Sequence, residues 1–463
     1  MMKARSLTAA LLLTLSSGPA LAQAEPPRAP RMPPRRAPPT SPGSERPAPR
    51  GMSKADRDAA LTAIAAALRE SYVFPEKVPA IIERLEQSRK AGRYDLEDAG
   101  VLSERITVDL QAASSDRHLY LNHDPVQYAA EQQRAEHGTP DEAAGPDELL
   151  RREALRDHHG LSEMKLLPGN LRYLRITGFE WVRDETGTVY DDAMRFLKDG
   201  DAIIIDLRGN GGGEHAAVRY LVSHFLDGDV LELTFLAGKN PPVQSRTLEH
   251  VPAGRLKGKP LYVLIDGNVA SAGEAFAYDV AQFKLGELVG AKTVGAANNN
   301  RYVPIRPGFV LSVSFGRPVH AISNTNWEGV GVLPTVEAPP TQALETAQLL
   351  ALKRLSEAPG VSPEALADYE WARLDVEARL RPTTVPVERL KSLAGRYGDF
   401  EVALREGSLW MMRPGRPDRR LSPLTADGLF AVDGSDMLRV RFKPKTMETL
   451  WRGAPAPRVY PRS

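Results

Sequence analysis

Residues 259–283 read KPLYVLIDGNVASAGEAFAYDVAQF, and the rest of this 463-residue chain is organised around them. Within this stretch, Leu261–Ile265 is a short apolar run that predicts a buried strand, and a Gly-Asn pair ends it. From Ser271 onward the apolar residues follow helical spacing. We therefore expect Ser271 at a strand-to-helix turn, as the first residue of the helix, beside free backbone N–H groups. Such donors could hold the oxyanion that forms when a nucleophile attacks a carbonyl.

Ser271 also has a structural interpretation. Ser271 and Glu274 have the spacing of a capping box, in which Ser caps the helix and Glu reaches back to the Ser amide. Taken alone, this short motif favours the cap over the nucleophile. The decision depends on the rest of the chain.

The first residues have the pattern of a secretion signal, residues 1–22. Lys3 and Arg5 precede an apolar core at Leu7–Leu15, and Ala20–Ala22 forms a small-x-small cleavage site. The core is shorter than the ~20 residues that span a bilayer, so we expect no stable membrane insertion. The sequence predicts an exported protein, periplasmic or extracellular after cleavage near Ala22.

A linker, residues 23–52, follows the signal. From Glu25 to Met52 it contains ten Pro and six Arg and no apolar run from which a core could grow. This composition is typical of an extended, semi-rigid spacer.

Composition excludes several classes of function. A net charge of +1 argues against nucleic acid as a partner, because duplex-binding proteins usually carry a basic surplus. The chain has no Cys, which removes disulfides, thiolate zinc sites and a cysteine nucleophile. The nine His residues never form H-E-x-x-H or another metal-binding spacing. We therefore predict neither a metal site nor a cofactor.

The remaining chain divides into three parts. Residues 53–122 have three apolar patterns of helical spacing, followed by strand-like spacing that begins near His118. Residues 160–345 alternate strands and helices, which predicts an α/β core. Residues 387–463 have short alternating runs between turns, which predicts a small all-β domain. In the core we expect strands at 171–176, 202–207 and 309–315, a turn and short strand at 290–295, and helices at 190–197, 214–225 and 341–355.

Two further segments of the core carry polar or glycine signals. Gly211–Ala216 fits the dinucleotide pattern G-x-G-x-x-A, with Asp229 downstream, but its mid-chain position and consecutive glycines argue against NAD. The alternative is that these glycines let backbone amides approach a substrate carbonyl. Glu328 lies beside Trp327 in an apolar segment, where a carboxylate is either paired or orients another group.

Five motifs follow one another in the chain: Y-V-F-P at 72–75, D-x-H-L at 116–119, D-L-R-x-N-G-G-G at 206–213, V-A-S-A-G-E at 269–274 and N-W-E-G-V-G-V at 326–332. In this order they resemble the tail-specific (C-terminal processing) serine peptidase family, and most closely its branch with tricorn protease and the repeats of interphotoreceptor retinoid-binding protein. The resemblance implies a crotonase/ClpP-like ββα-superhelix core, with an N-terminal helical domain that supplies a catalytic His.

The family contains two catalytic designs. In the Ser-Lys design a Lys follows a T-x-G turn, but here Ala296 occupies that position and Lys292 precedes the turn. In the tricorn-like design a Ser acts with a His from the preceding domain and a late Glu. The resemblance places Ser271, His118 and Glu328 in those roles.

The implied reaction is peptide hydrolysis through an acyl-enzyme on Ser271. His118 would take the hydroxyl proton, and Glu328 would orient the imidazole. The backbone N–H of Ala272, with one from Gly211 or Gly212, would form the oxyanion hole.

Several positions depart from the family pattern. Thr335 stands where the family motif G-V-x-P-D ends in Asp, and Gly273 and Ala275 stand where relatives of this branch often carry Ala and Glu. Arg117 stands where tricorn has a Ser before its His, and Ser114 or Ser115 could supply that hydroxyl instead.

The sequence therefore predicts an exported serine peptidase that acts on a peptide or protein substrate. The rival interpretation is a non-catalytic protein that binds a hydrophobic ligand or a peptide on the same fold, as the retinoid-binding relatives imply. The sequence leaves the natural substrate, the oligomeric state and the role of the C-terminal β domain open.

Overall fold

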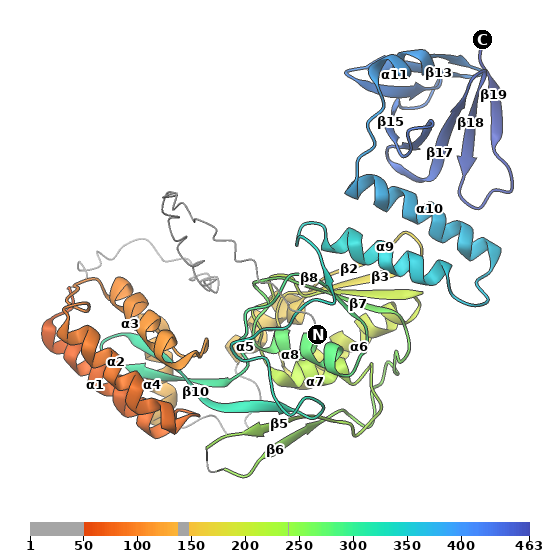
Figure 1. The fold of residues 1–463 in the computed structure, drawn as a ribbon. Coiled ribbons are helices and arrows are strands. Elements are labelled where there is room, and N and C mark those ends of the chain that lie inside the picture. Colours follow the sequence, from red (N-terminus) through yellow and green to blue (C-terminus); the bar gives the residue numbers. More distant parts are fainter. Residues whose placement is uncertain (1–50, 138–147, 239) are drawn as a thin grey trace, which may run out of the picture. The chain divides into compact units, whose positions relative to one another are not determined.

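The computed structural model describes residues 51–137, 148–238 and 240–463 (Figure 1). The predicted signal, residues 1–22, and residues 23–50 of the predicted linker lie outside these ranges. Among the residues that are described, no helix combines the length and the apolar character needed to cross a bilayer.

The three predicted N-terminal helices are α1 (Lys54–Ser71), α2 (Val78–Lys90) and α3 (Ala99–Ser114). Ser53 caps α1, because its hydroxyl accepts the N–H of Asp56 while the Asp56 carboxylate accepts that of Ser53. Apolar residues at helical spacing bury one face of each helix. Their shared core contains Ile64, Leu68, Ile81, Leu85, Leu102, Ile106 and Leu110.

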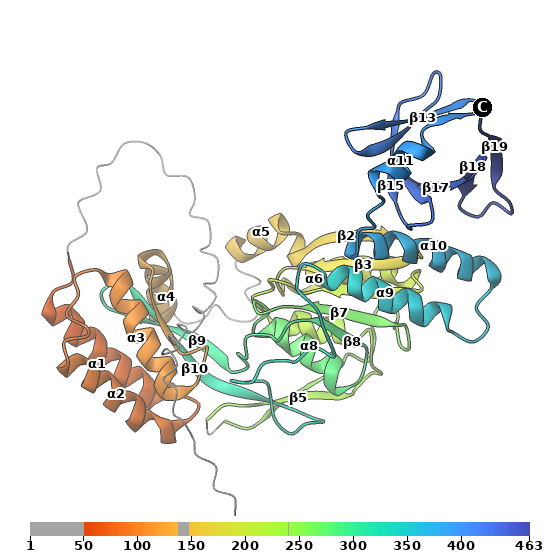
Figure 2. The same ribbon diagram turned by 45° about the horizontal axis from the view of Figure 1, so that its top comes forward.

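A single long strand connects this helical part to the α/β core. Strand β10 (Phe309–His320) is antiparallel to β1 (Tyr120–His123) at one end and to β5 (Leu231–Leu236) at the other (Figure 2). Strand β9 (Asn299–Ile305) also pairs with β10, and β6 (Val243–Arg246) pairs with β5. The predicted strand at 309–315 is therefore real but extends five residues further.

The α/β core is a six-stranded sheet of order β11-β8-β7-β4-β3-β2. All neighbours are parallel except β2 and β3. The strands are β2 (Leu161–Leu167), β3 (Leu171–Ile176), β4 (Ala202–Asp206), β7 (Leu261–Ile265), β8 (Glu287–Gly290) and β11 (Val336–Glu337).

Helices cover both faces of this sheet. Helices α6 (Arg183–Lys198), α7 (His215–Val222) and α8 (Ala272–Gln282) pack with Ile203, Ile205, Val263 and Ile265. Helices α9 (Ala343–Ser356) and α10 (Pro363–Leu380) pack with Ile204, Tyr262 and Leu264. Alternate residues of β4 and β7 thus face opposite layers, which explains why these strands are continuously apolar.

Several segments differ from their predictions. The predicted short strand within 290–295 is absent, because the chain after Gly290 is irregular and its amides donate to several separate segments, three of them to backbone carbonyls and that of Gly295 to Glu274. Residues 356–386, for which the sequence predicts no element, contain the whole of α10. Two more helices without a predicted counterpart, α4 (Pro125–His137) and α5 (Glu148–Arg156), lie between β1 and β2. His118 lies in a turn two residues before β1, not at the start of the strand.

The C-terminal part begins with α11 (Val387–Leu393) and continues as an eight-stranded antiparallel sheet, as predicted. A bridge between Tyr397 and Arg462 joins the last segment to the first strand, so the sheet closes on itself in a barrel-like manner. The strands are β12 (Gly395–Tyr397), β13 (Phe400–Arg405), β14 (Ser408–Met412), β15 (Arg419–Pro423), β16 (Leu429–Val432), β17 (Ser435–Lys443), β18 (Thr446–Trp451) and β19 (Arg458–Pro461).

A buried arginine attaches the β domain to α10. The Arg439 guanidinium is 3% exposed, lies 3.9 Å from the Trp371 ring centroid and pairs with Asp375 at 2.9 Å.

We expect Arg439→Ala to lower the first thermal unfolding midpoint by about 5–10 °C, because it leaves a half-buried carboxylate without its partner. Circular dichroism during heating measures this change. In contrast, Arg405→Ala should shift the midpoint by less than about 2 °C, because Arg405 and Asp418 form an exposed pair. Equal shifts in the two variants would contradict the structural role of Arg439.

Candidate active site

His118 is held in place by the loop that follows α3. Ser115 adopts a left-handed conformation (φ 58°) that turns the chain out of the helix. The buried Asp116 carboxylate then accepts the backbone N–H of His118 at 2.9 Å and the hydroxyl of Tyr72 at 3.1 Å. The imidazole is 9% exposed. Its position is thus set by the conformation of the turn and by the side chain two residues before it.

Glu328 lies in the turn after β10. The indole N–H of Trp327 donates to the carbonyl of Ala296 at 3.2 Å and fixes this turn. The Glu328 carboxylate accepts the backbone N–H groups of Ala297 and Asn298 at 2.6 and 2.9 Å. It also accepts the N–H of Arg117 at 3.3 Å. Arg117 therefore contributes a backbone amide that ties the His118 loop to Glu328.

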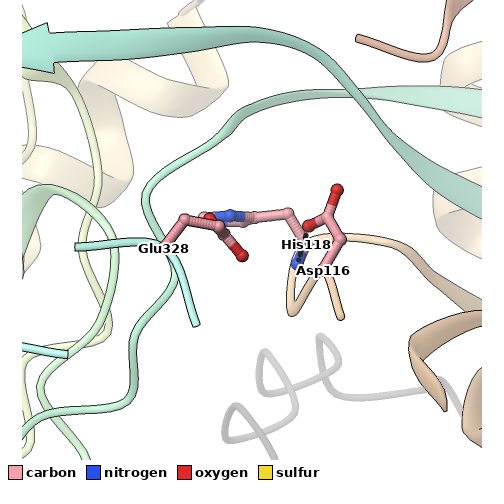
Figure 3. A group of neighbouring side chains, drawn as sticks. All are labelled: Asp116, His118 and Glu328. Atoms are coloured by element: carbon pink, nitrogen blue, oxygen red, sulfur yellow. Dashed lines mark hydrogen bonds between the residues drawn. The ribbon is translucent and has the colours of Figure 1, made fainter. Parts of the chain in front are cut away.

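These contacts bring three titratable side chains together. A ring nitrogen of His118 and carboxylate oxygens of Asp116 and Glu328 all lie within 4.8 Å of one another. Figure 3 shows Asp116 and His118 on one loop, with Glu328 on a separate segment beside the imidazole. The Nδ1 atom of His118 is buried without a hydrogen-bond partner. The two predicted residues His118 and Glu328 are thus neighbours, although 210 positions separate them.

Burial shifts the pKa values of both His118 and Glu328. Burial, and then the negative charge of Asp116, raise the pKa of Glu328 to about 7, against the opposing effect of its three N–H donors. Burial lowers the pKa of His118, while Asp116 opposes this shift. At neutral pH the imidazole is therefore in the neutral form that can accept a proton.

Ser271 is the residue before α8, and its backbone is strained. Its φ of 52° and ψ of −119° lie outside the regions that non-glycine residues favour, at a cost of about 1–3 kcal/mol. Ser271 and Glu274 are arranged as in the predicted capping box, although the hydroxyl makes no cap hydrogen bond. The Ser271 hydroxyl is therefore half-buried and makes no capping hydrogen bond.

Glu274 has a larger role than a cap. Its fully buried carboxylate accepts the N–H of Ser271 at 3.0 Å and the hydroxyl of Thr293 at 2.5 Å. It also accepts the N–H groups of Gly295 and Ala296 at 2.6 and 2.8 Å. The next two amides along the chain bind Glu328. Residues 293–298 thus join the Ser271 turn to the segment that holds Glu328.

The bond from the Ser271 amide to Glu274 is confirmed as predicted, but sequence reasoning missed the bonds of Glu274 to residues 293–296 and the role of Asp116. Both residues stand in the motifs D-x-H-L and V-A-S-A-G-E. A spacing of two or three residues from a proposed catalytic residue is the signal that could have identified them.

Comparison with known proteins assigns the two segments that carry this site. Residues 170–338 match the model of peptidase family S41, and residues 54–157 match the model of the N-terminal domain of this family in eukaryotic interphotoreceptor retinoid-binding protein. The chain belongs to peptidase family S41.

A curated relative is the carboxy-terminal processing protease CtpB of Bacillus subtilis (strain 168). It is 27% identical over 180 residues, which is 38% of this chain and 35% of the relative. The match therefore spans about a third of that relative's length.

Solved structures also match this chain, at lower sequence identity than this relative. The photosystem II D1 C-terminal processing protease has a TM-score of 0.40 and 15% identity, over 67% of this chain and 99% of that one. Tricorn protease has a TM-score of 0.40 and 14% identity, over 64% of this chain and 37% of that one. A lipoprotein from Streptococcus agalactiae has a TM-score of 0.43 and 13% identity, over 67% of this chain and 99% of the lipoprotein chain.

In this S41 chain the glycine run lies against Ser271. A Cβ added to Gly212 would lie 2.7 Å from the Ser271 Cβ and 3.0 Å from the Ala272 nitrogen. Gly212 donates its own N–H to the Asn210 side chain at 2.8 Å. The Gly212 amide is thus already engaged, which is at odds with its predicted role as an oxyanion donor and leaves Gly211 as the candidate.

A lysine and two serines near the motifs have different environments. Lys292 is exposed, and Ala296 occupies the position where the Ser-Lys design needs its Lys. Ser114 is buried and its hydroxyl accepts the N–H of Asp116 at 3.1 Å, whereas Ser115 is exposed.

The space beside Ser271 can be tested with two glycines. We expect Gly212→Ala to slow the reaction of Ser271 with a fluorophosphonate probe by on the order of 10²-fold, because the new methyl group occupies the oxyanion region. Gly209→Ala is the matched control, since Gly209 has a similar positive φ but a Cβ there meets nothing within 4 Å. It should keep the wild-type rate within about threefold, because its new methyl group reaches neither Ser271 nor Ala272. Equal rates for both variants would contradict this arrangement.

The pKa of Glu328 predicts a pH dependence. Only the ionised carboxylate can stabilise an imidazolium, so the probe reaction should rise with pH through about 7, the pKa of Glu328. The pKa of His118 is lowered, so its own titration lies at lower pH than this rise in rate. Asp116→Asn should move the rising limb of the pH–rate profile to lower pH, because the Asp116 charge raises the pKa of Glu328. Rates measured from pH 5 to 9 test this, and an unmoved limb in Asp116→Asn would refute the assignment to Glu328.

Proposed function

We propose that the protein is an exported serine peptidase that hydrolyses peptide bonds through an acyl-enzyme on Ser271. The convergence of His118 and Glu328 carries this proposal, because neutral imidazole beside a buried carboxylate is the arrangement that activates a serine. The strained turn at Ser271 adds a half-buried hydroxyl at a helix N-terminus. Glu274 and residues 293–298 connect the two parts.

The reaction assigns one task to each residue. His118 takes the hydroxyl proton while the Ser271 oxygen attacks the substrate carbonyl. The resulting oxyanion accepts N–H bonds from Ala272 and Gly211. His118 then gives its proton to the amine that leaves, and a water molecule hydrolyses the acyl-enzyme by the same steps in reverse order. Glu328 holds the imidazole and stabilises its cationic form.

The substrate is a peptide or a protein. The relative named as a carboxy-terminal processing protease supports cleavage directed to carboxyl ends, within the segment that the two chains share. A net charge of +1 and membership of a peptidase family both argue against nucleic acid as a partner.

Two finer features belong to the same proposal. The parallel sheet with helices on both faces, and strand β10 beside it, supports the crotonase/ClpP-like superhelix that the motifs imply. The charged start, apolar core and small-residue site within residues 1–22 support export to the periplasm or the medium.

Intact-mass analysis after treatment with a fluorophosphonate probe tests the proposed function. Wild type should gain a single adduct, Ser271→Ala none, and His118→Ala should react on the order of 10²-fold or more slowly, since it lacks the base. Arg117→Ala is the neighbouring control. It should react within about threefold of wild type, because Arg117 bonds to Glu328 through its backbone. Folded wild type that gains no adduct would overturn the peptidase assignment.

A further inference from the structure

The cluster of Asp116, His118 and Glu328 also has the composition of a metal site. One imidazole nitrogen and two carboxylate oxygens converge within 4.8 Å. All three side chains are at least partly buried, so none of them is a freely solvated surface group. Sequence spacing could not reveal this cluster, because the third member comes from a segment 210 residues beyond the others.

A second observation points to a ligand at this position. The Nδ1 atom of His118 is buried without a hydrogen-bond partner, on a side chain that is more than nine-tenths buried. The side chain of Asn298, which is 2% exposed and whose backbone N–H binds Glu328, likewise leaves both its amide atoms without partners. Buried polar atoms are nearly always paired, so the unpaired Nδ1 atom of His118, in a cluster with two carboxylates, indicates an external ligand.

The donor set selects the class of ion. Imidazole with carboxylates suits Zn²⁺ and its neighbours in the first transition series, whereas Mg²⁺ and Ca²⁺ prefer oxygen ligands alone. At zinc bond lengths of about 2.0–2.2 Å, ligand atoms lie roughly 3.4 Å apart. Side-chain rotation would have to close the present separation of up to 4.8 Å by at most about 1.4 Å.

We propose that Asp116, His118 and Glu328 form an inhibitory Zn²⁺ site. The bound ion would occupy the imidazole that Ser271 needs as its base and the carboxylate that orients it, so binding and catalysis exclude each other. The inhibition rests on the proposed peptidase function, but the binding does not. With three protein ligands and an open fourth position, the site is of the exchangeable kind and chelators should empty it.

Calorimetric titration with ZnCl₂ tests the binding independently of activity. The full chain with Ser271→Ala should bind one Zn²⁺, and EDTA should release it. In the same background Asp116→Asn and Glu328→Gln should each weaken binding by about tenfold or more. Co²⁺ should replace Zn²⁺ and give visible absorption bands typical of bound cobalt, whereas Mg²⁺ at the same concentration should give no heat.

His123→Gln is the matched control for adventitious binding. His123 ends the strand that follows His118, is exposed, and packs its ring on Phe309. This variant should bind Zn²⁺ as the parent does. Unchanged binding in both Asp116→Asn and Glu328→Gln, or a loss in His123→Gln equal to theirs, would overturn the site. Far-ultraviolet circular dichroism confirms that each variant is folded.

The fluorophosphonate reaction of the wild-type chain tests the inhibition. Zn²⁺ at ten times its dissociation constant should slow the reaction about tenfold, and EDTA should restore it. Binding without any slowing of an active chain would overturn the inhibition and leave the ion site in place. A chain that binds Zn²⁺ but does not react with the probe at all would show failure of the proposed function instead.

Discussion

The arrangement of the site depends on one buried carboxylate, that of Glu274. A carboxylate in a protein interior is costly unless its oxygens receive enough donors, and Glu274 receives four. Burial raises its pKa, while these hydrogen bonds oppose the shift. One donor comes from the strained Ser271 and three come from residues 293–296. The same interaction therefore holds the unusual backbone at Ser271 and fixes the loop that continues to Glu328.

The second constraint is the pairing of β1 with β10. His118 comes from the helical part of the chain and Glu328 from the core, and β10 runs through both. The antiparallel register pairs Tyr120 with Ser312, so the loop before β1 lies toward the C-terminal half of β10. The backbone bond from Arg117 to Glu328 then joins this loop to the turn after β10. In this way strand pairing and a backbone hydrogen bond, which does not involve the side chain of Arg117, position His118 and Glu328.

Much of the fold follows from sequence because its signals are local. The strands at 171–176 and 261–265 have the predicted bounds, since each is a short run rich in Leu, Ile, Val and Tyr between turn formers. Helix α10 was missed because its charged residues mask a narrow apolar face at Tyr369, Ala372 and Val376. The short strand expected near 290–295 fails because its amides donate to separate segments: those of Ala291, Thr293 and Val294 to three different backbone carbonyls, and that of Gly295 to the Glu274 side chain. Local propensity contains no information about such a partner.

In the candidate site, too, local sequence patterns give one part of the answer and tertiary contacts give the rest. The motifs identify Ser271, His118 and Glu328 one by one, because each stands in a short pattern. Their mutual effects depend on tertiary contacts, and these account for the shifted pKa of Glu328 and for the engaged amide of Gly212. Two carboxyl groups and an imidazole with an unpaired nitrogen are a costly combination inside a protein, at about 1–3 kcal/mol for each unsatisfied polar group. A core built for stability alone would satisfy or replace them. Their presence where the His118 loop meets Glu328 therefore argues that this site is built to exchange protons and ligands.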